Sequence, residues 1–340
     1  MPSFFLKSIA LLLLFLLICP LAEAEEVHLL RFASPYGMNA PFSRADRAWM
    51  DRMTSESNGR LQFEAYWNGT LVGRSHTVHE LAAGVADIGV ISPVVSRAGM
   101  HLTRGSLAFY GGIFDREITE PIFWELWAEH AELREEFAGV VILAANGFSP
   151  MFVMTTAKPV RGLDDLRGLR LKSTAEKVRA LRRLGVDAVA MPMSEAYFAL
   201  SRGILDGAIS PADTLVSLHF DETIRYITLL PNPRPPYPSR AINQSAWNRL
   251  PGELRNLIAS SSEWWADRIV DEVAAVEQMG LEHAREIGIE FIEPAPADLR
   301  RYMDNLAEEG DSIARELDAR SLPGSAMLEQ VRDRLELEAR

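Results

Sequence analysis

Cysteine is almost absent from this sequence of 340 residues. Its single cysteine, Cys19, lies in an N-terminal segment that we expect to be removed, so the mature chain would carry no thiol. A chain without thiols cannot form a disulfide scaffold, use a cysteine nucleophile or bind a metal through thiolates. These three classes of protein are therefore excluded on composition.

Long apolar runs are equally scarce, and the only one covers residues 9–18. Lys7 precedes it and a small-x-small sequence at 22–24 follows, an order typical of a secretory signal peptide. The run is too short to cross a hydrocarbon core, which needs about 20 apolar residues. We expect residues 1–24 to be a cleaved signal peptide and the mature protein to be periplasmic. An uncleaved membrane anchor and lipidation at Cys19 are the alternatives.

Catalytic and metal-binding motifs are also missing. The sequence has no Gly-x-Ser-x-Gly and no phosphate-binding glycine loop. His76 and His79 are spaced for one helix face, but no third ligand stands at a familiar spacing. The formal net charge of −12 argues against nucleic acid as a partner. We therefore expect no enzyme activity, no cofactor and no metal.

The remaining pattern alternates short strands with helical stretches, which predicts an α/β protein. A second block of strands and helices begins near Phe152, and prolines at 231–236 predict an extended, stiff connection. The longest predicted helical stretch covers 251–287. The predicted strands lie at 27–33, 61–66, 86–91, 140–145, 169–172, 189, 208–209, 226–230, 240–245 and 289–292.

Polar and aromatic residues recur where the predicted strands end. Ligands of open α/β folds bind at the carboxyl ends of strands, where loops converge. A Gly-Gly pair after Tyr110 also predicts a loop beside a pocket. The candidate pocket residues from these positions are Ser34, Tyr36, Trp67, Ser92, Tyr110, Asn146, Thr174, Ser210 and Asp213.

Four segments carry a resemblance to a known family. They are YWNGTLVGRSHTVHELAAGVADIGV at 66–90, PVRGLDDLRGLRLKST at 159–174, MPMSEAYFALSRGILDGAISP at 191–211 and AWNRLP at 246–251. In this order and at these separations they resemble the motifs of TRAP-transporter solute-binding proteins, the DctP-type receptors. The resemblance extends over most of the mature chain.

This resemblance implies a class II periplasmic-binding-protein fold, with two α/β lobes around a ligand cleft and a long bracing helix. Lobe I would hold 25–150 and 238–275, and lobe II 151–237 and 276–340. Residues 231–237 would cross between the lobes. The implied function is a monomeric receptor that captures a small organic anion, a carboxylate, and delivers it to the TRAP membrane permease. A periplasmic ligand sensor of a signalling system is the alternative.

Three positions depart from the family pattern. Lys172 stands where most members place an arginine that binds the ligand carboxylate, and lysine keeps the charge without the planar fork. Ser210 replaces a frequent asparagine, and Met193 replaces the usual aromatic residue. We add Lys172, Met193 and Arg234 to the predicted ligand-binding residues; Arg170 and Arg240 are further candidate anion partners.

Overall fold

The computed structural model describes residues 26–338, apart from 74, 97, 114, 175, 176 and 192. The side chains of residues 147–149, 194, 231, 233 and 234 are likewise outside the description. The expected signal peptide, residues 1–24, lies outside the described residues. No described helix is both long enough and apolar enough to cross a membrane.

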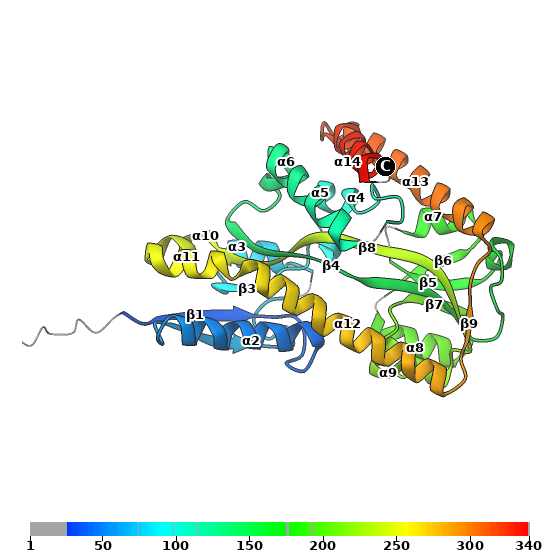
Figure 1. The fold of residues 1–340 in the computed structure, drawn as a ribbon, viewed down its shortest axis with the longest axis horizontal. Coiled ribbons are helices and arrows are strands. Elements are labelled where there is room, and N and C mark those ends of the chain that lie inside the picture. The colour runs from blue at the N-terminus through cyan, green and yellow to red at the C-terminus, as the bar shows by residue number, and fades with distance from the viewer. Residues whose placement is uncertain are drawn as a thin grey trace, which may run out of the picture.

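Nine strands of the described chain form one continuous mixed sheet (Figure 1). Its order is β2-β1-β3-β8-β4-β7-β5-β6, and β9 pairs with β8 off this path. The strands are β1 (His28–Ala33), β2 (Leu61–Tyr66), β3 (Ile88–Val90), β4 (Val140–Thr155), β5 (Arg170–Ser173), β6 (Asp187–Ala190), β7 (Gly207–Ser210), β8 (Tyr226–Asn243) and β9 (Glu290–Ile292).

Two long antiparallel strands, β4 and β8, join the two ends of this sheet. The C-terminal end of β8 pairs with β3, and the C-terminal end of β4 pairs with β7, so each strand runs through both halves. The sequence predicted separate strands on either side of the prolines, whereas β8 continues through them. Register shifts between the two strands accompany this stretch, and proline, which cannot donate to a ladder, is tolerated at such irregularities.

The first lobe is the half of the molecule built on β1, β2 and β3. Its core packs α2 against the sheet and includes Trp49, whose ring stacks on Trp265 with centroids 3.9 Å apart. The second lobe is built on β5, β6 and β7. The helices of the two lobes are α2 (Pro41–Glu56), α3 (Thr77–Ala82), α4 (His101–Ser106), α5 (Arg116–Glu129), α6 (Ala131–Glu135), α7 (Val178–Arg183), α8 (Met193–Ser201), α9 (Thr214–Ser217), α10 (Gln244–Arg249) and α11 (Gly252–Ser260).

The longest helix, α12 (Ser262–Glu286), runs along both lobes (Figure 1). Near its start Trp265 lies in the core of the first lobe. Near its end Gly280 packs directly against the backbone of Ala212 in the second lobe, and any Cβ at this position would collide with the Ala212 carbonyl oxygen. This helix is the bracing element that the family resemblance implies.

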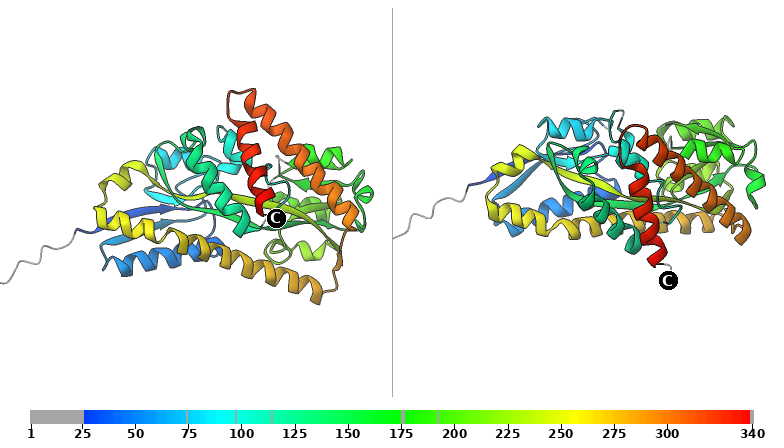
Figure 2. Two further views of the ribbon diagram at one scale, coloured as in Figure 1. Left: turned by 45° about the horizontal axis from the view of Figure 1, so that its top comes forward. Right: turned by 90° about the horizontal axis from the view of Figure 1, so that it is seen from above.

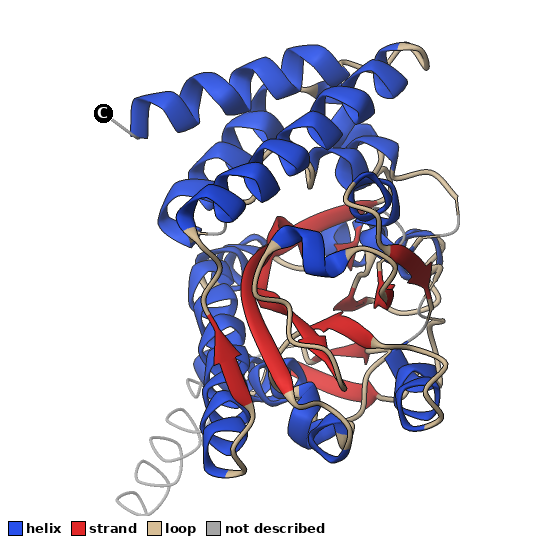
Figure 3. Ribbon diagram, turned by 90° about the vertical axis from the view of Figure 1, so that its right-hand side faces the viewer, coloured by secondary structure: helices blue, strands red, loops and turns tan. Residues whose placement is uncertain are grey.

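The last two helices, α13 (Pro296–Asp318) and α14 (Gly324–Glu338), lie against elements of both lobes. They contact α4 and α5 on one side and α7 on the other (Figure 2). Seen from the end of the molecule, they form part of a helical layer above the sheet (Figure 3). The chain therefore closes one side of the space between the lobes with its own C-terminal segment.

Candidate functional site

A cavity of about 510 Å³ lies between the lobes. The first lobe lines it with a short 3₁₀ turn, η1 (Pro93–Val95), and with α4. The second lobe lines it with the ends of β5 and β6 and with α7, while β8 and α13 complete the walls. Cavities of about 300–1,000 Å³ are typical of small-molecule sites. Both lobes therefore contribute to one enclosure of suitable size.

The end of β5 places two hydroxyl groups at this cavity. Side chains alternate along a strand, so Leu171 and Ser173 project from one face of the sheet and Lys172 from the other. Ser173 is only 1% exposed, and its Oγ has no hydrogen-bond partner. The Oγ1 of Thr174 is also buried without a partner. Each such hydroxyl costs about 1–3 kcal/mol, which a ligand that accepts hydrogen bonds would offset.

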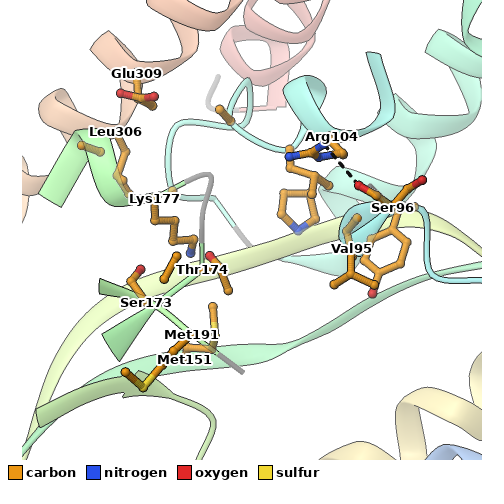
Figure 4. Close-up of a pocket in the computed structure, with 18 residues that line it drawn as sticks. Val95, Ser96, Arg104, Met151, Ser173, Thr174, Lys177, Met191, Leu306 and Glu309 are labelled. Atoms are coloured by element: carbon orange, nitrogen blue, oxygen red, sulfur yellow. Dashed lines mark hydrogen bonds between the residues drawn. The ribbon is translucent and has the colours of Figure 1, made fainter. Parts of the chain in front are cut away.

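Two cationic side chains also line the cavity (Figure 4). The ammonium group of Lys177 points toward Thr174, on the wall formed by the second lobe. Arg104 lies on the opposite wall, where its Nη1 donates to the backbone oxygen of Ser96 at 3.4 Å. The ammonium group of Lys177 and the guanidinium group of Arg104 therefore lie on opposite sides of the cavity.

One carboxylate, that of Glu309, is present among the described lining residues. Arg179 Nε donates to its Oε1 at 2.9 Å, and Arg183 Nη1 donates to its Oε2 at 2.7 Å. The hydrogen bond to Glu309 holds the pKa of Arg179 above its ordinary value, so the pair remains ionised. Because two guanidinium groups compensate Glu309, the lining presents net positive charge.

Of the residues predicted to bind the ligand, Thr174 alone is among the described residues that line the cavity. Lys172, Ser210 and Met193 lie together on the other face of the second-lobe sheet. Lys172 is in register with Ala208 of β7, two residues before Ser210, and is 3% exposed. The Ser210 Oγ lies 2.9 Å from Thr214 Oγ1 and 3.7 Å from the sulfur of Met193. Their contact with a ligand stays a prediction.

Several other predicted residues have structural partners. Asn146 of β4 links β8 to the long helix α12. Its Nδ2 donates to the backbone oxygen of Ala266 in α12 at 3.2 Å, and its Oδ1 accepts from the Ser239 hydroxyl in β8. Asp213 accepts a hydrogen bond from Ser217. Tyr110 is buried with its hydroxyl unpartnered, and burial raises its pKa above the ordinary value. A ligand role for these residues is likewise untested.

The predicted residues of the first lobe lie around its core and loops. Trp67 packs on Phe32, with ring centroids 5.6 Å apart, and Tyr36 packs edge-on against Phe42. The Oγ of Ser34 accepts from the Tyr36 N–H at 3.2 Å, and the backbone N–H of Ser92 donates to Thr77. None of the four predicted residues, Ser34, Tyr36, Trp67 and Ser92, is among the described residues that line the cavity. Their ligand role stays a prediction.

The expectation that Arg240 or Arg170 would bind the ligand anion is not supported by their surroundings. Arg240 is buried in an ion pair with Asp46, with Nε and Oδ1 2.7 Å apart, and Trp265 also donates to that carboxylate. Arg170 lies at the protein surface and pairs with Asp187 at 3.0 Å. Both guanidinium groups are committed to internal partners. The side chain of Arg234 lies outside the description, although its backbone pairs with β4.

Three lining residues, Ser173, Lys177 and Arg104, were not among the predicted ligand-binding residues, although the strand end 172–174 that holds Ser173 was recognised. One signal for Lys177 was available: the sequence holds only four lysines, Lys7, Lys158, Lys172 and Lys177, against many more arginines. Two of the four lie within six residues of each other at the end of β5. No local signal identifies Arg104, because the packing of α4 against α13 brings it to the cavity.

Three kinds of comparison place the chain among known proteins. The family model described as bacterial extracellular solute-binding protein, family 7 (DctP), matches residues 37–316. The uncharacterized protein YiiZ of Salmonella typhimurium is 25% identical over 52% of this chain, and the match spans only 55% of YiiZ. The C4-dicarboxylate-binding periplasmic protein DctP of Rhodobacter capsulatus is 23% identical over 69% of this chain and 70% of that protein.

Another relative and two solved structures extend the comparison. The 2,3-diketo-L-gulonate-binding periplasmic protein YiaO of Escherichia coli is 21% identical, covering 84% of this chain and 85% of its own. A TRAP solute-binding protein from Rhodoferax ferrireducens, in complex with benzoate, gives a TM-score of 0.74 at 22% identity, covering 92% and 99%. One from Bordetella bronchiseptica, with bound mandelate, gives 0.75 at 19% identity, covering 91% and 99%. The predicted two-lobed α/β fold is thereby confirmed.

Proposed function

The chain belongs to family 7 of the bacterial extracellular solute-binding proteins, and on that premise we propose that it is the receptor of a tripartite ATP-independent periplasmic (TRAP) transporter. It captures a small organic carboxylate and delivers it to the membrane permease. The observation that carries this proposal is the cavity between the lobes, with two cations and two unpartnered hydroxyl groups in its lining.

The chemistry of the cavity favours an anion. A carboxylate is an acceptor that can satisfy buried hydroxyl donors and an ammonium group at the same time. The carboxylate of Glu309 does not oppose this, because Arg179 and Arg183 compensate its charge. The ligands for which the related proteins are named, or with which they were crystallised, are C4-dicarboxylate, 2,3-diketo-L-gulonate, benzoate and mandelate, and all of them are carboxylates.

Further features of the proposed receptor are inferred from the amino-acid sequence. We propose export through cleavage after Ala24, a monomeric mature chain and binding without catalysis. The lobe boundaries at 150/151, 237/238 and 275/276 belong to the same proposal, with ligand binding expected to close the lobes through bending of β4 and β8.

A thermal-shift screen of the mature protein tests the proposed function. The panel holds carboxylates, sugar acids, amino acids and uncharged solutes. A ligand that binds only the folded state stabilises it by about 2.7 kcal/mol at a hundredfold excess over Kd. We expect one or more carboxylates to raise Tm and their amides or alcohols to have no effect. Stabilisation by uncharged solutes alone would contradict the proposal.

A further inference from the structure

The buried hydroxyl groups of the described lining that have no hydrogen-bond partner are concentrated at one end of the cavity, where a lysine also lies. The Ser173 and Thr174 hydroxyls follow β5, and the Lys177 ammonium group points toward Thr174 (Figure 4). Three side chains within five residues of sequence therefore converge on one small region. An acceptor with one negative charge matches this set of donors.

The body of the cavity is apolar. Aliphatic and thioether side chains dominate the described lining, including Val94, Val95, Leu107, Met151, Met191 and Leu306. A sugar acid placed here would bury its hydroxyl groups against carbon atoms, and polar groups buried without hydrogen bonds weaken binding. An apolar ligand body gives up no hydrogen bonds on entering such a cavity, and the removal of its surface from water favours binding.

A dicarboxylate would need a second polar end, and Arg104 on the opposite wall is the candidate for it. On that wall Arg104 Nη1 donates to the backbone oxygen of Ser96 at 3.4 Å, and Ser96 Oγ donates to the backbone oxygen of Ala98 at 2.7 Å. Among the described residues, no buried unpartnered hydroxyl lines that wall. Within the described lining, the buried hydroxyl groups that lack an acceptor are thus confined to the end of β5, which favours that end for the carboxylate of the ligand.

We propose that the ligand is a monocarboxylate with an apolar aliphatic or aromatic body, bound with its carboxylate at Ser173, Thr174 and Lys177 and its body between Met191 and the valines of η1. This inference rests on the proposed function and narrows its ligand class. Lysine offers a single point of contact, where arginine would offer a fork, and so suits an acceptor that two hydroxyl groups already share.

Calorimetric titration of the mature protein tests the ligand class. The probes are phenylacetate, cyclohexanecarboxylate and 4-methylpentanoate, with phenylacetamide, succinate and glucuronate as comparisons. We expect at least one apolar acid to bind with a negative heat-capacity change, the signature of apolar burial. Phenylacetamide should bind at least 100-fold more weakly than phenylacetate, and succinate and glucuronate at least 10-fold more weakly than the best apolar acid.

Variants with matched controls test the assigned ends of the ligand. Lys177→Met should weaken binding of the best apolar acid by 30-fold or more, whereas Lys158→Met, an exposed lysine, should leave it unchanged. Thr174→Val should weaken it by about tenfold, the effect of one hydrogen bond to a charged group. Met191→Thr should weaken apolar acids several-fold, with the exposed Met279→Thr as its control.

The outcomes separate the two proposals. Preferential binding of succinate or glucuronate would overturn the apolar ligand class and leave the carboxylate receptor standing. Absence of binding by all three apolar acids would also overturn it, and the thermal-shift screen would then decide the broader function. Equal binding of phenylacetamide and phenylacetate would contradict both. Unchanged affinity in Lys177→Met and Thr174→Val would remove these residues from the site.

Discussion

Glu277 on α12 shows how a single buried carboxyl can make the stability of this molecule depend on pH. It is 7% exposed, and its Oε2 accepts from the backbone N–H of Ala212 at 2.8 Å. Burial, with the nearby negative charge of Asp213 adding to it, raises the pKa of Glu277 from 4.5 to about 7. The folded protein therefore binds this proton more tightly than the unfolded chain does.

The stabilising contribution of this proton is complete below about pH 4.5 and is lost as the pH rises through about 7. At about 1.36 kcal/mol per unit of pKa, the loss is on the order of 3 kcal/mol at most. The Glu277→Gln variant keeps the shape of the side chain and cannot ionise. Its free energy of unfolding, relative to that of the wild type, should therefore increase as the pH rises from 4.5 to 8. Urea unfolding across this range measures the difference, and parallel curves would contradict the assignment.

Single residues also show what the sequence could and could not predict about the site. The motif ending in Lys172-Ser173-Thr174 identified a strand end that reaches the cavity, and Thr174 lines that cavity. Side chains alternate along a strand, so Ser173 projects from the same face of the sheet as Leu171. The family pattern directed the prediction to Lys172, which projects from the opposite face. The burial of Arg240 against Asp46 could not be predicted, because their partnership joins residues 194 positions apart.

At the scale of elements, the brace depends on one close approach. Gly280 of α12 lies against the backbone of Ala212, which follows β7, and a side chain there would meet the carbonyl oxygen. Gly280→Ala should therefore force α12 away from the second lobe and destabilise the protein by about 1–3 kcal/mol.

Gly252 provides the matched control for this substitution. It begins α11, and a Cβ there would meet nothing within 4 Å. Gly252→Ala should be neutral or slightly stabilising, because it lowers the entropy of the unfolded chain. Thermal unfolding of both variants measures the contrast. Equal stabilities would show that the contact between α12 and Ala212 is not tight.

Element prediction succeeded where the pattern was local and failed where pairing overrode it. The long helical stretch and the strands near 27–33 and 61–66 are present at nearly the expected positions. The prolines of 231–236 predicted an interruption, yet β8 continues through them because β4 supplies a partner along its whole length. The placement of α13 beside the cavity depends on contacts remote in sequence, which no local pattern contains.

At the scale of the whole molecule, the arrangement joins two lobes by long strands and one long helix. The cavity lies where the lobes face each other, so a ligand that touches both walls gains contacts that neither lobe supplies alone. Binding energy gained in this way can stabilise a closed arrangement over an open one. If ligand binding closes the lobes as proposed, we expect the bending to occur in β4 and β8 where their register shifts.

The most direct test of this account is a crystal structure of the mature protein with the carboxylate that gives the largest thermal shift. We expect the ligand to lie in the cavity between the lobes. Its carboxylate oxygens should lie about 2.7–3.2 Å from the Thr174 hydroxyl and the Lys177 ammonium group. The protein has another cavity, lined in part by Arg116 and Trp124 of α5, and a ligand bound there instead would contradict the central claim.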